Sequence, residues 1–578
     1  MNPSSPPSSS WLTPGRSWAL LLIIAACLFF IGLGRLPLLE PDEGRNAEVA
    51  REMIVSHDWI TPHYDSLPYL DKPVFLFWTI AGSFLCFGIG EFAARFPSAL
   101  AALATVLLAG LIAKRMSDHR TALRAGLILA TSPLFLGLAR FTIFDMTLTF
   151  FVTVALLCFW LNGRQGFSTR WLDVIAFAAM GAGALTKGPV GFLIPLLVLV
   201  VFHALAGNFR ELRKLHWASG WLVFLAVTLP WFIAVSLRNP GFPKYAFWEE
   251  SLLRFATGAH LHRSQGFYYY IPVYLAGFLP WSFFLLFVAW NRLKKWRALR
   301  QEAHRKELFL LVWAGTIFVF FSVSHSKLPG YFLPALIPLS ILTAVAWREL
   351  DLPEGTRPPD WLTAGFAVMI ILGILMAASP QLLRFHGIEA HLTKKLPASV
   401  WALMKSSLFM GGVILAALGF LGRNMVSRSR KKVTKELAFG IVALAIPLLM
   451  VRWILPLSHY FDAFSSRHLA QAILDSPQRE MPVYGYYYFR TSLPFYLKRP
   501  VGLVTSDGDE ITSNYVVSRF EKLRTTEWRF PGAPGQQDSP ERLLIDAGQL
   551  RALSRSAPGP FLLMVQNNEI DQALSVAG

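Results

Sequence analysis

The sequence predicts a polytopic α-helical membrane protein with about 13 transmembrane helices, followed by a small α/β domain at the C-terminus. Of its 578 residues, 54% are hydrophobic and only 16% are charged, whereas soluble domains carry about 25% charged residues. Apolar runs of membrane-spanning length recur as far as residue 455, and the rest of the chain is more polar. These observations together exclude an ordinary soluble enzyme.

The apolar runs are roughly 17 to 22 residues long, the length that crosses about 30 Å of hydrocarbon as a helix. The first run, which starts near Trp18, lacks a small-residue cleavage site before Arg35 and is followed by many more spans, so we expect an uncleaved first helix. The predicted crossings are 18–37, 93–113, 122–139, 144–161, 172–186, 189–206, 217–237, 268–290, 307–324, 331–347, 361–378, 400–421 and 437–455.

The basic residues sort the linkers between these runs into two sets. Lysine and arginine cluster in every second linker, which the positive-inside rule makes cytoplasmic, so the other linkers face outward. The net charge of +18 therefore reflects membrane topology and not a nucleic-acid surface. The three cysteines, all inside apolar segments, have no paired spacing and predict neither a disulfide framework nor a thiolate metal site.

The chain divides into three parts by composition. Residues 1–17 are a Ser/Pro-rich, disordered cytoplasmic N-terminus, residues 18–455 form the transmembrane domain, and residues 456–578 form the external α/β domain. The outward segment at about 41–90 carries two expected interfacial helices, 41–55 along the membrane surface and 73–88, which is too short to cross. In the tail we expect strands at 482–488, 501–504 and 561–565, a helix at 468–474 and a loop at 530–540.

A polar cluster directly after the first apolar run is the first candidate site. Asp42 stands in the predicted first turn of a helix, where the helix dipole favours an ionised carboxylate. Arg45 lies three residues later on the same face and can pair with Asp42 or with an anionic ligand. Such a carboxylate can position or deprotonate an attacking group; a helix-capping acid with a surface ion pair is the alternative interpretation.

Three outward turns carry lysines, which are otherwise depleted on that side of a membrane. They are Asp71-Lys72-Pro73, Lys187-Gly188 and Ser326-Lys327. We expect them to converge on an anion such as a lipid phosphate, whereas snorkelling to the interface is the alternative for each lysine alone. Arg140 and Asp145 bracket a further outward turn and form either an internal ion pair or part of the active site.

A divalent metal site is a weaker hypothesis. His260 and His262, spaced by two, together with outward acids such as Asp71 and Glu250 supply suitable ligands, but no spacing fixes the site. Arg263 is a better candidate for binding phosphate because its planar guanidinium donates two parallel hydrogen bonds. No P-loop or dinucleotide motif is present, so the energy for an external reaction has to arrive in the substrate.

Several of these motifs, in this order, resemble the bacterial 4-amino-4-deoxy-L-arabinose transferases of lipid A. These belong to the protein O-mannosyltransferase-like superfamily of polyprenyl-phosphate-dependent glycosyltransferases, which have the GT-C fold. The resemblance covers about residues 35–335 and is specific for the superfamily more than for the sugar. The motifs are Glu40–Glu48, Asp71–Pro73, Phe92–Ser98, Asp145–Phe150, Leu185–Val190 and Ser326–Pro329.

The resemblance implies an undecaprenyl-phosphate-linked sugar as donor and a lipid A phosphate as acceptor, at the periplasmic face of the inner membrane. It implies that Asp42 is the catalytic carboxylate beside Arg45, that Lys72 binds the donor phosphate and that Asp145 is a second functional acid. Arg263, Lys327 and Tyr331 are implied as donor-site residues. The family often has Glu where this chain has Asp71, which weakens a metal role for that position.

Two alternatives remain from the sequence. A polyprenyl-phosphate-dependent enzyme can use another sugar, or another acceptor such as protein hydroxyls or an envelope glycan. A lipid transporter instead places its site in broken helices near the membrane midplane, whereas the unusual charges here gather at one face.

Overall fold

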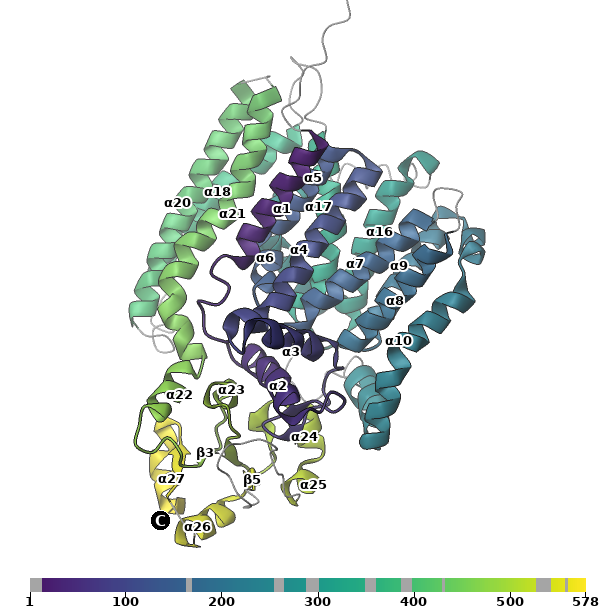
Figure 1. The fold of residues 1–578 in the computed structure, drawn as a ribbon. Helices are drawn as coiled ribbons and strands as arrows, with labels where there is room; N and C mark the ends of the chain where they lie inside the picture. The colour runs from purple at the N-terminus through teal and green to yellow at the C-terminus, as the bar shows by residue number, and fades with distance from the viewer. Residues whose placement is uncertain are drawn as a thin grey trace, which may run out of the picture.

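The computed structural model describes residues 13–162, 169–253, 265–286, 301–348, 360–385, 398–428, 432–525, 542–556 and 560–577. A bundle of long helices makes up most of the molecule, and the C-terminal domain covers one end of it (Figure 1). The predictions for the N-terminal residues 1–12, and for the loop at 530–540, lie outside the described residues.

The long helices follow the predicted apolar runs. Over the described ranges, seven helices are long and apolar enough to cross a membrane, or eight if the bent pair α5 and α6 counts as one span. The chain is therefore a polytopic helical membrane protein. The bundle helices are α1 (Pro14–Phe30), α4 (Glu91–Met116), α5 (His119–Ala130), α6 (Pro133–Ala139), α7 (Phe144–Asn162), α8 (Arg170–Lys187), α9 (Val190–Ala206), α10 (Trp217–Arg238), α13 (Tyr270–Gly277), α16 (Arg305–Val323), α17 (Leu336–Trp347), α18 (Asp360–Phe385), α20 (Ala398–Arg428) and α21 (Lys432–Phe461).

Local sequence explains where these helices begin and break. At the start of α1, the Thr13 side chain accepts a hydrogen bond from the Arg16 amide at 3.4 Å and Pro14 occupies the first turn. The predicted crossing 122–139 is instead bent by 70° between α5 and α6, because Pro133 cannot continue the helical hydrogen bonds of the preceding turn. The predicted crossing 268–290 is likewise interrupted after α13, next to Pro280.

Two short helices lie between the bundle and the C-terminal domain. These are α2 (Asp42–Ser56) and α3 (Phe75–Phe87), which match the two predicted interfacial helices in position (Figure 1). Every residue of α2 from Glu43 to Met53 is buried by other parts of the protein, and its expected position along the membrane surface stays a prediction. A hairpin of β1 (His63–Tyr64) and β2 (Leu67–Pro68) and the C-terminal domain cover this helix.

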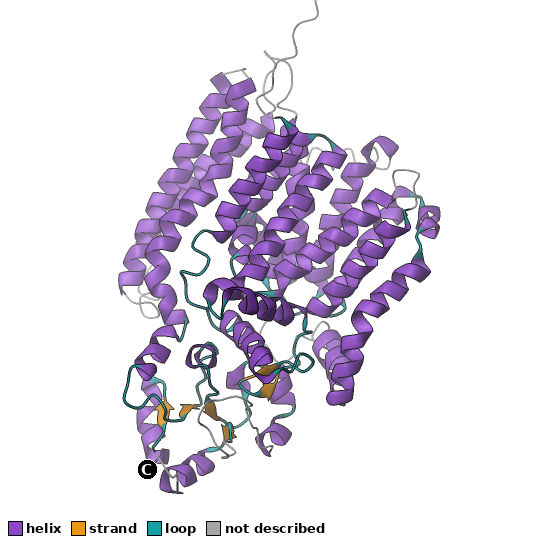
Figure 2. Ribbon diagram, in the orientation of Figure 1, coloured by secondary structure: helices purple, strands orange, loops and turns teal. Residues whose placement is uncertain are grey.

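The C-terminal domain contains a four-stranded parallel sheet in the order β5-β4-β3-β6 (Figure 2). The predicted strands and the predicted helix are present as β3 (Val483–Tyr486), β4 (Gly502–Val504), β6 (Leu562–Met564) and α22 (Arg467–Leu474). The two-residue strand β5 (Leu544–Ile545) was not predicted, since two residues carry no detectable alternation. The remaining helices are α23 (Leu493–Leu497), α24 (Asn514–Ser518), α25 (Phe520–Thr525), α26 (Ala547–Ser556) and α27 (Ile570–Ala577).

Several π-helical and 3-10 segments connect the longer helices, and two of them lie at the site. A π-helix, η2 (Tyr245–Leu253), follows α10 and the three-residue helix α11 (Phe242–Lys244), and a 3-10 segment, η5 (Pro329–Ala335), precedes α17. Further 3-10 turns are η1 (Phe209–Lys214), η3 (Phe267–Tyr269), η4 (Glu302–His304), η7 (Asp462–Phe464), η8 (Asp509–Ile511) and η9 (Asn567–Glu569).

Candidate functional site

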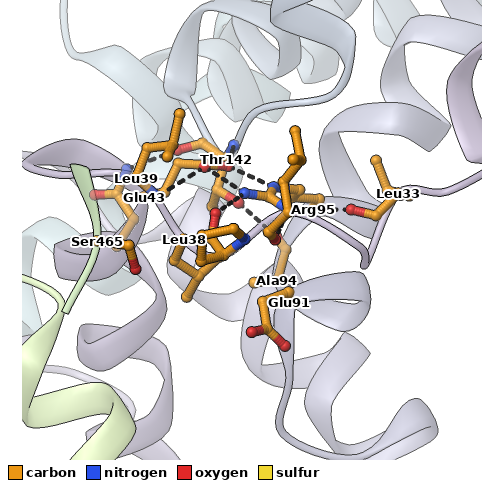
Figure 3. A network of polar contacts seen from close by, with 12 residues as sticks. Leu33, Leu38, Leu39, Glu43, Glu91, Ala94, Arg95, Thr142 and Ser465 are labelled. Carbon is orange, nitrogen blue, oxygen red and sulfur yellow. Dashed lines mark hydrogen bonds and ion pairs between the residues drawn. The ribbon is translucent and has the colours of Figure 1, made fainter. Parts of the chain in front are cut away.

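A buried ion pair fixes the start of α2, and with it the first candidate residue. Arg95 donates to both carboxylate oxygens of Glu43, at 2.8 and 2.6 Å, and both side chains are only 2% exposed (Figure 3). The same guanidinium also donates to the carbonyls of Leu33, Leu36 and Pro37 at 2.6 to 3.1 Å. The chain that leaves α1 is thereby held against α4.

Glu43 also links α2 to the turn before α7. Its carboxylate accepts hydrogen bonds from the amides of Leu39 and Thr142, at 3.1 and 3.0 Å. Asn46, one turn later, donates to the Thr142 carbonyl at 2.9 Å. The network therefore sets the position of Asp42 relative to Asp145, although the two acids are far apart in sequence.

Asp42 points toward a polar cavity, as a half-exposed carboxylate. It forms an ion pair with Arg45, and its side chain remains 51% exposed. Arg45 is buried and also donates to the carbonyl and hydroxyl oxygens of Thr512, at 3.0 and 2.8 Å. The C-terminal domain thus holds the partner of the candidate catalytic acid.

Asp71 is held by three donors. It accepts hydrogen bonds from the Tyr245 hydroxyl and from the amides of Asn514 and Tyr515, the last at 2.8 Å. Burial raises the pKa of Asp71, the nearby Glu250 raises it further, and the hydrogen bond from Tyr245 opposes the shift. A carboxylate with this many partners acts mainly as a fixed acceptor in the wall of the site.

The two lysines at the site are both paired with acids. Lys72 forms an ion pair with Glu250, whose other carboxylate oxygen accepts a hydrogen bond from the Asn514 side chain at 3.2 Å. Lys187, at the end of α8, forms an ion pair with Asp145 and lies 4.0 Å above the ring of Tyr331. Gly188 follows with φ +70°, which lets the chain turn immediately after this lysine.

The structure gives two of the cations marked by the sequence partners other than the expected ones. Arg140 does not pair with Asp145 but donates to the carbonyls of Leu28, Phe29 and Ile31 at 2.8 to 3.1 Å, where it caps the end of α1. Lys327 does not join the other two lysines, because its amine donates to the carbonyls of Ser324 and Gln265. Lys327 is 4% exposed, and its hydrogen bonds connect the segment around Gln265 to the loop after α16.

Two adjoining cavities are lined by these residues. A small polar cavity of about 90 Å³ is bordered by Asp42, Arg45 and Asp145. A larger, mostly apolar cavity of about 480 Å³ is lined by aromatic and aliphatic side chains of α9, α10, η2 and α16. Four of the described residues border both cavities, namely Asp71, Lys72, Lys187 and Tyr331.

The metal hypothesis gains no support from the described residues, which contain no cluster of three or more metal-binding side chains. His260, His262 and Arg263 lie outside the described residues, so their predicted roles are not tested. Glu250 was considered only as a general outward acid, and Thr512 and Asn514 were missed altogether. No motif marks the last two, because only the docking of the C-terminal domain brings them to the site.

Comparison with known proteins places this site in a family context. Residues 18–246 match the family model of dolichyl-phosphate-mannose-protein mannosyltransferases. The chain is 32% identical over 451 residues to an undecaprenyl phosphate-alpha-4-amino-4-deoxy-L-arabinose arabinosyl transferase from Aeromonas salmonicida, covering 76% of this chain and 77% of the relative. An arabinosyl transferase of the same name from Pseudomonas paraeruginosa is 33% identical, and the match covers 63% of this chain but only 64% of that relative.

The fold comparison extends over nearly the whole chain. The crystal structure of ArnT from Cupriavidus metallidurans bound to undecaprenyl phosphate matches with a TM-score of 0.78 at 30% identity. This match covers 97% of the present chain and 94% of the solved one. The apo structure of the same protein matches with a TM-score of 0.76.

Proposed function

Because this chain belongs to the family of undecaprenyl phosphate-alpha-4-amino-4-deoxy-L-arabinose arabinosyl transferases, we propose that it transfers 4-amino-4-deoxy-L-arabinose from undecaprenyl phosphate to a phosphate of lipid A. The single observation that supports this function best is the position of Lys72 and Lys187 at the junction of a polar and an apolar cavity. A polyprenyl phosphate sugar has the same division, with an apolar chain, an anionic phosphate and a polar sugar.

The donor fits the site in one orientation. The prenyl chain occupies the apolar cavity between α9, α10 and α16, because the aromatic and aliphatic side chains that line this cavity suit a hydrocarbon chain. The phosphate lies at Lys72, with Lys187 as the second cation, and the sugar enters the polar cavity toward Asp42. Tyr331, under the Lys187 amine, forms part of the wall between the two.

The reaction breaks the bond between the anomeric carbon and the donor phosphate oxygen. A lipid A phosphate oxygen forms the new bond to that carbon, and undecaprenyl phosphate leaves with the bonding electrons. Cations held near the leaving phosphate stabilise the charge that develops on it, which is the largest contribution the site can make. Because the acceptor is already ionised, Asp42 orients the acceptor or balances nearby positive charge instead of removing a proton.

The other candidate residues take supporting roles in this proposal. Arg45 holds Asp42 in place, and Asp145 keeps Lys187 directed at the junction of the cavities. Arg263 is retained as a proposed phosphate-binding residue on sequence grounds alone. Lys327, with its amine on two carbonyls, is proposed to shape the loop before η5 and not to bind the donor directly.

We further propose a GT-C topology with about 13 crossings in a bacterial inner membrane, with the site and the C-terminal domain in the periplasm. The alternation of basic linkers supports this orientation. Lipid substrates then reach the site from the outer leaflet, through the apolar cavity.

Mass spectrometry of lipid A from cells with and without this protein tests the function. We expect a pentosamine on a lipid A phosphate only when the protein is present. Addition of a different sugar, or modification of another envelope glycan or a protein, would instead assign a different acceptor or donor to the same polyprenyl-phosphate chemistry. Movement of lipid without transfer would identify a transporter.

A further inference from the structure

The Lys72–Glu250 ion pair lies where the proposed donor has to bind. Both side chains line the apolar cavity, with exposures of 20% and 12%, and Lys72 also borders the polar cavity. A phosphate that binds Lys72 therefore competes with the Glu250 carboxylate for the same amine. The question is what Glu250 does once Lys72 has a new partner.

The balance of charges around the two cavities limits which ligands can bind. Among the residues that the structure describes, three ion pairs border the cavities, namely Asp42–Arg45, Glu250–Lys72 and Asp145–Lys187. In a partly buried site, an anion that binds one of these cations competes with the carboxylate paired to it, and the added negative charge costs free energy. A ligand that carries one negative and one positive charge avoids this cost, because it replaces one internal ion pair by two new ones.

The donor of the proposed function is such a ligand. Its phosphodiester carries one negative charge, and the 4-amino group of the sugar is a cation at neutral pH. We propose that Glu250 is a specificity-determining residue that binds the amino group of the sugar after the donor phosphate has displaced it from Lys72. The inference rests on the proposed function, because it assigns a role to the amino group of that donor.

Glu250 is better suited to this exchange than the other acids at the site. The Asn514 side chain, which lines the polar cavity proposed for the sugar, donates to its second oxygen at 3.2 Å. The carboxylate therefore lies beside that cavity and keeps this partner when Lys72 turns to the phosphate. It lies on the π-helix η2, a geometry that is frequent at functional sites. Asp42 pairs with Arg45, a cation that the phosphate does not contact in this proposal. Asp145 pairs with Lys187, the second cation proposed for the phosphate, and keeps that side chain in place.

The exchange also distinguishes substrate from product. Undecaprenyl phosphate that has lost its sugar carries no cation, so Glu250 again competes with it for Lys72. The ion pair therefore favours binding of the amino sugar donor and release of the spent carrier.

Full-length protein with Glu250→Gln provides the test, because glutamine keeps the shape and removes the charge. Two quantities are measured: the Kd of undecaprenyl phosphate alone, and kcat/KM for donors that carry either an amino or a hydroxyl group at C4 of the sugar. We expect E250Q to bind undecaprenyl phosphate several-fold more tightly. We also expect it to lose about tenfold in kcat/KM with the amino donor, the effect of one charge-assisted hydrogen bond, and little with the hydroxyl donor.

Glu249→Gln is the matched control, since Glu249 is the neighbouring acid on the same π-helix but borders neither cavity. It should change neither quantity. If E250Q does not fold, Asn514→Ala replaces it, because that variant keeps the carboxylate and removes its second anchor. The expected result is a smaller loss of preference for the amino donor.

Two results would overturn the exchange: weaker binding of undecaprenyl phosphate by E250Q, or equal losses with both donors. Failure of the proposed function gives a different result, in which the wild-type protein transfers neither sugar to lipid A. In that case, tighter binding of undecaprenyl phosphate by E250Q still supports the competition at Lys72, and unchanged binding rejects it.

Discussion

Two ion pairs at the same end of the helical bundle differ in what surrounds them. The Glu43–Arg95 pair is 2% exposed on both sides, and backbone groups satisfy most of its remaining hydrogen-bonding capacity. The Lys72–Glu250 pair borders two cavities and retains 20% and 12% exposure. The first pair is closed and holds the chain in place, whereas the second is open to exchange with a ligand.

This difference separates structural from functional charges better than residue type does. Arg95 and Lys72 both lie in motifs that the sequence marks, and both pair with a glutamate. Lys327 and Lys72 likewise look equivalent in the sequence, yet carbonyls hold the Lys327 amine. The partners of a charged group and the space beside it decide its role.

The largest effect is expected from Arg95→Met. Removal of one partner of a buried, hydrogen-bonded ion pair costs about 3–5 kcal/mol of stability, and three backbone carbonyls lose their donor as well. Thermal unfolding of the purified protein in detergent measures the loss. In a double-mutant cycle with Glu43→Gln, the double variant should lose less than the sum of the singles, and strict additivity would show that the two residues act independently.

Asp42→Asn should abolish most sugar transfer without unfolding the protein. A group that positions the reactants contributes on the order of 10²-fold to a reaction rate, whereas an ion pair as exposed as this one contributes at most about 1 kcal/mol to stability. Transfer to lipid A in proteoliposomes and thermal unfolding measure the two effects. Asp58→Asn is the control, because Asp58 pairs with Arg238 away from both cavities, and retention of full transfer by D42N would reject its role.

Lys72→Met and Lys327→Met compare a lysine that borders the cavities with a lysine whose amine is held by backbone carbonyls. Loss of Lys72 should weaken binding of undecaprenyl phosphate about tenfold or more, since a charge-assisted hydrogen bond to phosphate disappears. Loss of Lys327 should leave that affinity nearly unchanged and lower the unfolding temperature instead. Binding of undecaprenyl phosphate to both variants decides the matter, and the reverse pattern would assign the phosphate to Lys327.

The smallest effect concerns a buried region in which acids outnumber the cation, formed by Glu48, Arg51, Glu52 and Asp65. Burial raises the pKa values of Glu52 and Asp65 well above normal, so the folded protein binds protons that the unfolded chain releases. Stability is then full below the unfolded pKa values of about 4 and falls as the pH rises toward the raised values.

Unfolding temperatures measured between pH 4 and pH 8 test this prediction. Glu52→Gln should flatten the decline, because one of the two titrating groups is gone. Glu480→Gln is the control, since that side chain is 87% exposed and should leave the pH dependence as it is. An unchanged slope in E52Q would show that Glu52 is ionised in the folded protein.

Much of the fold follows from sequence periodicity alone. The lengths of the apolar runs, the basic linkers and the polar tail predicted the bundle, the short helices α2 and α3, and three of the four strands of the C-terminal sheet. The predictions failed where a local breaker acts, at the Pro133 bend. They also did not include the burial of α2, because that burial depends on contacts with another domain.

The candidate site residues could be found from the sequence, because charged residues next to apolar runs are rare and an unpaired charge beside hydrocarbon costs free energy. Asp42, Lys72, Asp145 and Lys187 were found in this way and border one cavity. Their partners became known from the three-dimensional arrangement alone. Glu250, Thr512 and Asn514 come from distant segments, and electrostatic pairing depends on distances of a few ångströms that no local pattern encodes.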